Sequence, residues 1–550
     1  MGTDVLAPSP ARTTTVWVPD GRPAVFRGDQ ITAYAARIRE PLHLVASTTG
    51  HGIGVGIGGT ITAGIAAEGP GDGAEGHRLV GMLPALYPEW LGDRSFNEAH
   101  GARFPYVAGE MAGGIATTAM VIAMARADML GFFGAGGLSV ERVEQAVAEL
   151  KAALPGRTNW GVNLIHSPAE PATEEAVAAL LLAAEVPAVS ASAFMELTPA
   201  VVRLAAHGLT RDPGGRVRRR TRLFAKVSRP EVAEQFMRPA PAHLLRALVE
   251  RGHLTEAEAE LAASVPVAED ITVEADSGGH TDNRALTVVL PIMLALRARL
   301  AKEHRYDRPI RVGAAGGLGT PGAVAAAFAL GAAYVVTGSI NQASVESGMS
   351  EDGKAMLSGA GMADVVMAPA ADMFELGVKL QVLRRGTMFA FRAAQLHQVY
   401  TSYGSWDEVP EQTRAKIERT QLRASYADVW AGTRAFWLDR EPEQIAKAER
   451  DPRHQMALVF RWYLGMSSRW AVQNDGTRRT DYQIWCGPAM GAFNDWAAGG
   501  FLAEPADRSV VQIARNLLEG AAVITRAQQL RTHGVAVPHA AFAYEPRPLD

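Results

Sequence analysis

Residues 310–339 read IRVGAAGGLGTPGAVAAAFALGAAYVVTGS, two short apolar runs joined by an alanine-rich stretch of helical character. The first run, IRVGAAG (310–316), and the second, AAYVVTG (332–338), both end in glycine. A strand, a helix and a second strand in this order form a βαβ unit, in which the two strands are parallel. The stretch therefore predicts a parallel sheet with glycine-rich turns at the C-terminal ends of its strands.

The same alternation of apolar runs and helical stretches extends back to about residue 104. Eight such units favour a closed (β/α)8 barrel, which buries both faces of its strands. A doubly wound open sheet is the alternative, although that fold usually has fewer strands. The eight expected strands are YVAGEM (106–111), LGFFGAG (130–136), NWGVNLI (159–165), PAVSAS (187–192), RLFAKVS (222–228), ITVEAD (271–276), IRVGAAG (310–316) and AAYVVTG (332–338).

The barrel pattern divides the chain into three parts. We expect an α/β fold with a (β/α)8 TIM barrel over residues 101–350, interrupted by a charged helical insert at 229–270. Within the insert we expect a pair of helices, because LLRALVERG ends in glycine and LTEAEAELAA has at its start a threonine that is suited to cap a helix. Residues 1–100 are rich in Gly and Pro and predict a small, irregular N-terminal subdomain. Residues 351–550 predict a mostly helical C-terminal region, with no convincing strand after residue 345.

Composition indicates a globular protein. The 550 residues carry a net charge of −4, with 48% hydrophobic and 20% charged residues, so electrostatics give no case for nucleic acid or an anionic membrane. A single cysteine excludes an intrachain disulfide and any multi-cysteine metal site, and no other metal-ligand spacing is present. The chain contains no apolar run of roughly 18 residues and no signal-peptide pattern at its start. We therefore expect a cytoplasmic protein without a metal.

Glycine is concentrated at the C-terminal ends of the predicted strands, where a barrel of this kind has its active site. Ordinary turns also favour glycine, but five such loops together indicate a bound cofactor. The last two loops commonly form a phosphate site in this fold. We expect backbone N–H groups of Gly316, Gly317, Gly338 and Ser339 to bind a phosphate there.

Other residues at the same rim are candidates for contact with the rest of the cofactor. Met111, Ala112 and Gly113 follow the first strand and are placed to line a flat ring. Asn163 and Lys226 project from the third and fifth strands, and a lysine there would stabilise negative charge on a reduced ring. The alternative for Lys226 is a strand-end lysine that reaches water, because lysine is rarely buried without a partner.

The stretch EADSGGHTDN (274–283) places two glycines and a histidine at the end of the sixth strand. Gly278 and Gly279 would let the backbone pass close to the cofactor, with His280 on the substrate side. A histidine near its ordinary pKa can give or take a proton near neutrality. The alternative is a satisfied structural histidine. His166, in NLIHSP, is a second candidate at this rim.

Four further stretches have plainer interpretations. HGIGVGIGGT (51–60) lacks the helix and acidic residue of a dinucleotide fingerprint and is better interpreted as a tight strand or loop. The basic run RDPGGRVRRRTR (211–222) is typical of a solvated loop, with docking of an acidic carrier protein as the alternative. Cys486 has apolar neighbours, as a packed thiol does. FRWYLGMSSRW (460–470) indicates core packing or, alternatively, the lining of an acyl tunnel.

Several blocks together resemble the PfaD family, the trans-acting flavin-dependent enoyl reductases of polyketide and polyunsaturated fatty acid synthases. The resemblance covers roughly residues 40–530. The barrel blocks also resemble a broader superfamily of nitronate monooxygenases and FMN-type enoyl reductases, whereas the C-terminal blocks resemble PfaD proteins specifically. The blocks are GEMAGGIAT, WGVNLIHSP, EADSGGHTDN, GAAGGLGTPG, VKLQVLRRGTMFAFRAAQLHQVYTSYGS and DYQIWCGPAMGAFNDW.

The resemblance implies FMN as cofactor, NADPH as reductant (NADH being the open alternative) and an enoyl thioester on an acyl carrier protein as substrate. It implies hydride transfer from NADPH through flavin N5 to the β-carbon, with His280 as proton donor or as the group that positions the thioester carbonyl. His166 or water stays an alternative donor, and a homodimer is possible. A nitronate monooxygenase-like oxygenase and a non-catalytic flavin-barrel scaffold are rival functions. The cofactor-binding residues we expect are Glu110, Met111, Ala112, Gly113, Asn163, Lys226, Asp276, Gly278, Gly279, Ala315, Gly316, Gly317, Gly338 and Ser339.

Overall fold

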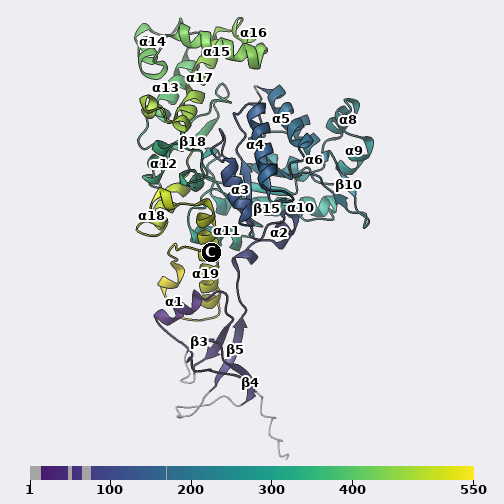
Figure 1. The fold of residues 1–550 in the computed structure, drawn as a ribbon, viewed down its shortest axis with the longest axis vertical. Coiled ribbons are helices and arrows are strands. Elements are labelled where there is room, and N and C mark those ends of the chain that lie inside the picture. The colour runs from purple at the N-terminus through teal and green to yellow at the C-terminus, as the bar shows by residue number, and fades with distance from the viewer. Residues whose placement is uncertain (1–13, 48–51, 65–75, 169, 550) are drawn as a thin grey trace, which may run out of the picture. The chain divides into compact units, whose positions relative to one another are not determined.

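The computed structural model describes residues 14–47, 52–64, 76–168 and 170–549 (Figure 1). The N-terminal stretch in which no signal-peptide pattern was found lies, up to position 13, outside the described residues. The chain divides into two compact units. The first takes the residues up to Leu91 together with Leu517–Glu545, and the second takes Gly92–Asn516 and the residues from Pro546 onward. The predicted division into domains at about residues 100 and 350 stays a prediction.

The second unit is built on a closed barrel of eight parallel strands, as the sequence predicted, so the open-sheet alternative is excluded. The eight strands are the eight predicted runs, in the order β12-β13-β15-β16-β6-β7-β8-β9 around the barrel. Nearly every strand residue is buried, because side chains fill the barrel and helices cover it. The strands are β6 (Tyr106–Ala108), β7 (Leu130–Phe133), β8 (Trp160–Ile165), β9 (Ala188–Ser192), β12 (Arg222–Val227), β13 (Asp270–Glu274), β15 (Arg311–Ala315) and β16 (Val335–Thr337).

Helices follow the barrel strands, and several begin at a side-chain cap. Thr117, Ser139, Thr198 and Thr320 each accept a hydrogen bond from a backbone N–H of the first turn, which is the usual way such a helix start is satisfied. The barrel helices, with one helix before the first barrel strand, are α2 (Arg94–His100), α3 (Thr118–Arg126), α4 (Val140–Ala153), α5 (Pro171–Ala183), α6 (Pro199–Ala206), α7 (Pro230–Met237), α10 (Leu286–His304) and α11 (Pro321–Ala329).

The predicted insert at 229–270 is helical. It contains α7, α8 (Ala242–Glu250) and α9 (Glu256–Ala262), one helix more than the predicted pair. Thr255 caps α9 in a reciprocal capping box with Glu258. The sequence predicts only a pair because α7 belongs to the βα alternation of the barrel and directly follows β12.

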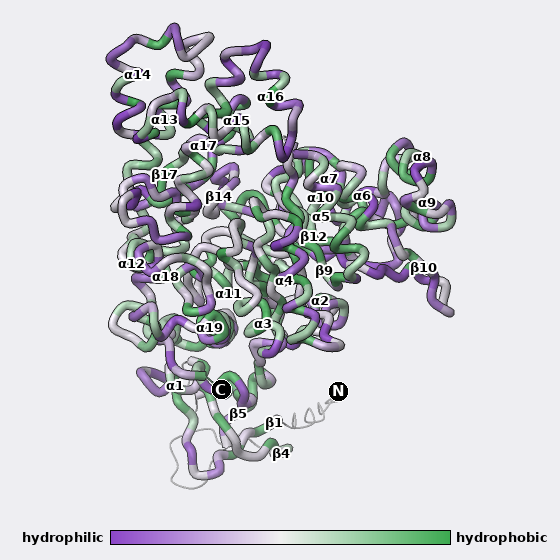
Figure 2. Tube along the Cα trace, turned by 45° about the horizontal axis from the view of Figure 1, so that its top comes forward, coloured by the Kyte–Doolittle hydropathy of each residue, from purple (hydrophilic) through white to green (hydrophobic). Residues whose placement is uncertain are grey.

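The basic run at 211–222 forms a short hairpin of β10 (Thr210–Arg211) and β11 (Val217–Arg218), a hydrophilic stretch in Figure 2. It leads into the N-terminal end of β12, and Arg219 donates to the carbonyl of Val267, just before β13. The run therefore lies at the N-terminal end of the barrel strands, away from the rim that the sequence analysis singled out.

The C-terminal region is mostly helical, as predicted, but the expectation of no strand after residue 345 is wrong. β17 (Val365–Pro369) and β18 (Lys379–Leu383) pair with each other, and β18 also pairs with β14 (Gly279–His280). β14 has two residues and is too short to be recognised from the sequence. The sequence therefore showed no sign of a strand with which β18 could pair. The other elements are α12 (Glu351–Ser358), α13 (Phe389–Ser402), α14 (Glu411–Ile417), α15 (Tyr426–Arg440), α16 (Pro442–Ala448), α17 (Pro452–Gln473), α18 (Ala489–Ala497), the start of α19 (Val510–Thr532) and short turns η2 (Ser339–Ala343), η3 (Glu418–Leu422), η4 (Gly476–Asp481) and η5 (Pro505–Asp507).

The first unit contains a five-stranded antiparallel sheet in the order β3-β2-β5-β1-β4, more regular than predicted. The described part of HGIGVGIGGT, residues 52–60, is a strand and a turn, as interpreted, and His51 lies outside the described residues. A side chain at Gly56 would lie 2.6 Å from the ring of Trp17, and one at Gly54 would lie 2.6 Å from the ring of Phe26. The glycines thus admit aromatic rings rather than a dinucleotide. The elements are β1 (Thr14–Val18), α1 (Asp29–Ala35), β2 (Leu42–Ala46), β3 (Ile53–Ile57), β4 (Thr60–Gly64), β5 (His77–Leu83), η1 (Pro88–Trp90), the later part of α19 and η6 (His539–Phe542).

Candidate active site

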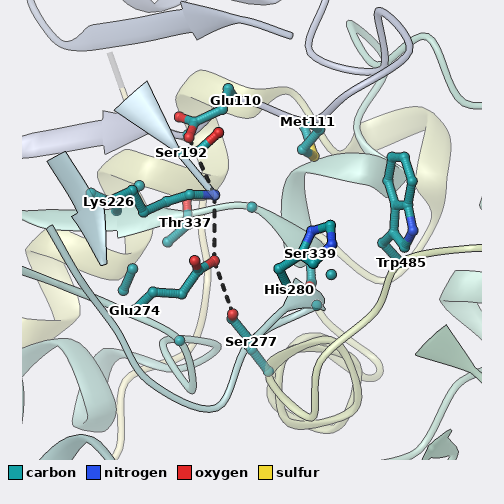
Figure 3. Close-up of a pocket in the computed structure, with 18 of the residues that line it drawn as sticks. Glu110, Met111, Ser192, Lys226, Glu274, Ser277, His280, Thr337, Ser339 and Trp485 are labelled. Carbon is teal, nitrogen blue, oxygen red and sulfur yellow. Dashed lines mark hydrogen bonds and ion pairs between the residues drawn. The ribbon is translucent and has the colours of Figure 1, made fainter. Parts of the chain in front are cut away.

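A cavity opens at the C-terminal ends of the barrel strands, the rim that the sequence predicted (Figure 3). It encloses about 1130 Å³, counting the solvent at its mouth. Residues from the ends of β6, β8, β9, β12, β13, β15 and β16 line it, so a ligand there touches most of the barrel. The predicted residues that line it are Glu110, Met111, Ala112, Asn163, Lys226, Gly278, Gly279, His280, Ala315, Gly316, Gly317, Gly338 and Ser339.

Two predicted cofactor residues do not line the cavity. The backbone N–H of Gly113 donates to the carbonyl of Gly136 at 2.7 Å, which turns this glycine away into the neighbouring loop. The carboxylate of Asp276 accepts hydrogen bonds from Asn283 at 3.0 Å and from Gln381 at 2.7 Å. Asp276 therefore fastens the loop after β13 to β18.

Lys226 lies between two carboxylates in the cavity wall (Figure 3). Its Nζ is 3.2 Å from Oε1 of Glu110 and 3.4 Å from Oε1 of Glu274, and its side chain is 19% exposed. Burial lowers the pKa of Lys226, but the two carboxylates raise it more, so the lysine is charged. Burial, together with Glu110, raises the pKa of Glu274. Lys226 is thus a buried, paired cation, and not a lysine that reaches freely into water.

Two strand ends contribute unpaired backbone donors. Within the part of the chain that the structure describes, the N–H groups of Gly316, Gly317, Gly338 and Ser339 have no protein acceptor. Gly317 has φ +72°, and a side chain at Gly317 or Gly338 would meet nothing within 4 Å. Gly316, Gly338 and Ser339 are half-buried and Gly317 is exposed, and free N–H groups at the rim of an open cavity fit an anionic group such as a phosphate.

Gly278 has a further neighbour that the sequence did not indicate. A side chain there would lie 2.8 Å from the backbone nitrogen of Cys486 and 2.9 Å from Oγ of Ser339. Gly487 in turn donates its N–H to Oγ of Ser339 at 3.0 Å. Gly278 therefore lets the chain at 485–487 approach, whereas Gly279, with φ +84°, has open space around it.

His280 reaches the cavity from β14, whose pairing with β18 fixes its backbone. Its Nε2 lies 3.1 Å from Oδ1 of Asp372, a residue in the loop between β17 and β18. Burial lowers the pKa of His280, but the hydrogen bond and charge of Asp372 raise it above its ordinary value. Burial raises the pKa of Asp372, and His280 lowers it overall.

The second histidine candidate does not reach the cavity. Nδ1 of His166 lies 2.9 Å from Oε2 of Glu174, and its ring stacks on Phe194 with centroids 5.0 Å apart. This is the satisfied structural histidine that was the alternative for both candidates. Cys486 is fully buried, and burial raises the pKa of its thiol to about 12, as expected of a packed thiol.

Sequence reasoning missed several residues of the site. Glu274, Ser192 and Gln342 line the cavity, and Trp485 stands beside His280 and Ser339 in Figure 3. Trp485 comes from the segment WCGPAMG, which contributed to the resemblance but carried no site prediction. The aromatic run at 460–470 lies in α17 and packs in the core, with Phe460, Tyr463 and Leu464 buried.

Over the described residues, no cluster of three or more His, Cys, Asp or Glu side chains is arranged to hold a metal ion. In the same residues, no helix is both long enough and apolar enough to cross a membrane.

The fold and the site define a (β/α)8 barrel protein with a cofactor-sized cavity at the C-terminal face of the barrel. The crystal structure of the enoyl reductase domain of MlnA from the macrolactin biosynthesis cluster of Bacillus amyloliquefaciens superposes with a TM-score of 0.77 at 37% identity. The match covers 81% of this chain and 99% of that domain. The chain therefore belongs to the family of this domain, the oxidoreductases of the PfaD type.

Curated relatives also match about four fifths of this chain. One of the polyunsaturated fatty acid synthase proteins of Thraustochytrium sp. is 48% identical over 466 residues, which is 83% of this chain and 31% of the relative. Polyketide biosynthesis protein PksE of Bacillus subtilis is 43% identical over 436 residues, 79% of this chain and 56% of the relative. The chain thus spans about a third to a half of these relatives. Residues 403–482 match the family described as acyl-carrier-protein S-malonyltransferase, inserted helical domain.

Proposed function

We propose that the protein is a trans-acting enoyl reductase for the α,β-double bond of enoyl thioesters carried on an acyl carrier protein. The reaction would belong to polyketide or polyunsaturated fatty acid biosynthesis. One observation carries the proposal: the cavity, with its free amides and His280, belongs to a chain that is 37% identical to an enoyl reductase domain, in a match that covers 81% of this chain and 99% of that domain. The acyl carrier protein and a possible homodimer are part of the proposal.

FMN is the cofactor that we propose for the cavity, with NADPH as the reductant that visits it. Gly316, Gly317, Gly338 and Ser339 would hold the phosphate through their free N–H groups. When bound, the flavin supplies the hydride that the β-carbon of the enoyl group receives. Lys226 would face the ring and offset negative charge on it, although its two carboxylate partners already balance much of its own charge.

His280 is the proposed proton donor to the α-carbon. It lines the cavity and carries a pKa raised by Asp372, so it is charged more often near neutrality than a free histidine. Asn163 also lines the cavity. Its amide donates to the carbonyl of Ser190 at 2.9 Å and to Oγ of Ser192 at 2.8 Å, which holds the side chain still.

The decisive experiment is anaerobic. The purified protein, once a flavin spectrum is recorded, is reduced with NADPH and mixed with a crotonyl thioester on a carrier protein or on N-acetylcysteamine. Flavin reoxidation with formation of the saturated thioester supports the reductase. Flavin that stays reduced until oxygen or a nitroalkane is admitted supports an oxygenase, and a protein that retains no flavin supports a scaffold.

Gly338→Val tests the phosphate position separately. At Gly338 φ is −129° and a side chain would meet no protein atom within 4 Å, so the fold should tolerate the change. The valine would occupy the space of the phosphate, and the dissociation constant of the flavin should rise at least about 10-fold, the factor that corresponds to 1.4 kcal/mol of binding free energy. Gly465→Val, at an exposed glycine of α17 with equally open surroundings, is the matched control. An unchanged dissociation constant in Gly338→Val would show that the phosphate lies elsewhere.

A further inference from the structure

The side-chain pair of His280 and Asp372 joins two segments that are 92 residues apart. β14 carries His280, and the loop between β17 and β18 carries Asp372. Pairing of His280 with Leu380 in the β14–β18 ladder brings the segments together. The side chains of His280 and Asp372 are 28% and 33% exposed, so both are partly withdrawn from water. The carboxylate that pairs with His280 therefore comes from a segment outside the barrel strands.

Hydrogen bonds fix both partners. Oδ1 of Asp372 also accepts the backbone N–H of Met373 at 3.1 Å, which fixes the direction of the carboxylate. On the other side, Gln381 of β18 donates to the carbonyl of Ser277 at 2.7 Å and accepts from Asn283 at 2.8 Å. The loop that carries His280 is therefore fastened at both ends to the strand pair that carries Asp372.

An ionised carboxylate only accepts hydrogen bonds, so Nε2 of His280 must carry its hydrogen toward Asp372. The tautomer is thereby set, and Nδ1 is the remaining ring nitrogen. Within the described residues the hydrogen bond of the ring is the one from Nε2, which leaves Nδ1 available to a ligand. A neutral His280 would present Nδ1 to the cavity as a base, whereas a protonated His280 would present it as an acid. The charge on the ring thus decides whether His280 acts as a base or as an acid.

We propose that Asp372 is a positioning residue that keeps His280 protonated on both nitrogens, so that Nδ1–H serves as the acid of the reaction. The proposal rests on the proposed enoyl reduction and names the group that orients its proton donor. In the step, the electron pair of the enolate forms the α-carbon–hydrogen bond as the Nδ1–H bond breaks. The imidazole is left neutral with its hydrogen on Nε2, Asp372 stays ionised, and solvent returns the lost proton.

The other charges near His280 have opposite effects on the pKa of its ring. Glu274 favours the charged ring and Lys226 opposes it, and these two are themselves an ion pair in the cavity wall. Arg461 acts on Asp372 from behind and favours its ionised form. Asp372 is consequently the partner whose removal should change the charge on His280 most.

The test is a pH titration of the His280 ring by NMR in ¹⁵N-histidine-labelled holoprotein, with the His280 signal assigned from its loss in His280→Asn. Asp372→Asn keeps the size of the side chain and removes its charge. The midpoint of the His280 titration should fall by about one pH unit or more, the usual scale for an opposite charge at this distance. Asp282→Asn is the matched control, because Asp282 lies two residues from His280 but pairs with Arg229 at 2.6 Å.

An unchanged His280 midpoint in Asp372→Asn, or an equal fall in Asp282→Asn, would overturn the proposal. The NMR result does not depend on enoyl reduction, so failure of the proposed function is seen separately, as absent turnover in a protein whose midpoint does shift. Where turnover is present, the alkaline limb of its pH profile should move down with the midpoint in Asp372→Asn. A uniform loss at every pH with an unshifted limb would indicate a purely structural carboxylate.

Discussion

The loops after β8 and β13 each place a histidine beside a carboxylate at the same rim of the barrel, yet of these two histidines it is His280 that lines the cavity. His166 and Glu174 are eight residues apart, and the carboxylate comes from the helix that directly follows the strand. His280 and Asp372 are 92 residues apart, and the carboxylate comes from a strand pair outside the barrel. The pair of His166 and Glu174 stabilises its own loop. The pair of His280 and Asp372 includes a histidine that lines the cavity.

The comparison shows that a histidine at a strand end is not in itself evidence of a site. Both histidines follow a barrel strand, and both hydrogen bonds are close to 3 Å. What differs is the surroundings: Phe194 covers His166, while His280 has open cavity beside it. Three predictions test how far this difference extends.

The largest effect is expected from Lys226→Met. Lys226 pairs with two carboxylates, Glu110 and, at the end of β13, Glu274. At the loop after β8, by contrast, the cation Arg440 pairs with the carboxylate of Glu170. Removing Lys226 leaves two buried carboxylates without a counter-charge, which typically costs about 3–5 kcal/mol. The thermal unfolding midpoint should fall sharply at neutral pH and less near pH 5, where the carboxylates can take up protons.

Lys226→Met with Glu110→Gln and Glu274→Gln is the control, because it removes all three charges together. It should recover much of the lost stability. If Lys226→Met alone is as stable as the wild type at pH 7, the three side chains do not stabilise one another. The ion pairs of Lys226 would then not distinguish the loop after β13 from the loop after β8.

His280→Ala and His166→Ala break the comparison at its centre. His280→Ala should leave the flavin bound but slow enoyl reduction about 100-fold or more, the usual scale for the loss of a general acid. His166→Ala removes a ring outside the cavity and should leave the turnover rate within a few-fold, with a modest loss of stability. The measurements are turnover with an enoyl thioester and flavin absorbance. Equal losses of activity in both variants would make His166 a proton donor as well.

The smallest effect is a difference in pH dependence of stability. Burial raises the pKa of Glu174, but hydrogen bonds from His166 and Thr198 lower it overall. That loop is therefore stabilised above the unfolded value of 4.5 and loses the contribution as pH falls through the folded pKa. The pKa of His280 is raised, so its contribution is complete below 6.5 and is lost as pH rises through the folded pKa.

Unfolding midpoints measured from pH 2 to 9 would show the contrast. Glu174→Gln should flatten the acid side of the profile, and Asp372→Asn should flatten the neutral to alkaline side. The same flattening in both variants would mean that the two pairs do not act separately.

The sequence predicted the barrel and the rim of the cavity because both depend on local pattern. Each βαβ unit is set by a run of apolar residues and the helix that follows it, and parallel closure brings all C-terminal ends to one rim. The glycines at 316, 317 and 338 were found for this reason. Asp276 was predicted as a cofactor residue but does not line the cavity, because Gln381 and Asn283, which are distant or unremarkable in the sequence, donate hydrogen bonds to its carboxylate.

The sequence by itself determined the closed barrel, and it placed His280 in the segment after β13 and glycines at the ends of the last two barrel strands. Only the tertiary structure decided that Asp372 meets His280, that both Glu110 and Glu274 pair with Lys226, and that Trp485 joins the cavity wall. These contacts link segments about 50 to 210 residues apart. Their geometry is set by packing and by strand pairing such as β14 with β18, for which no local periodicity exists.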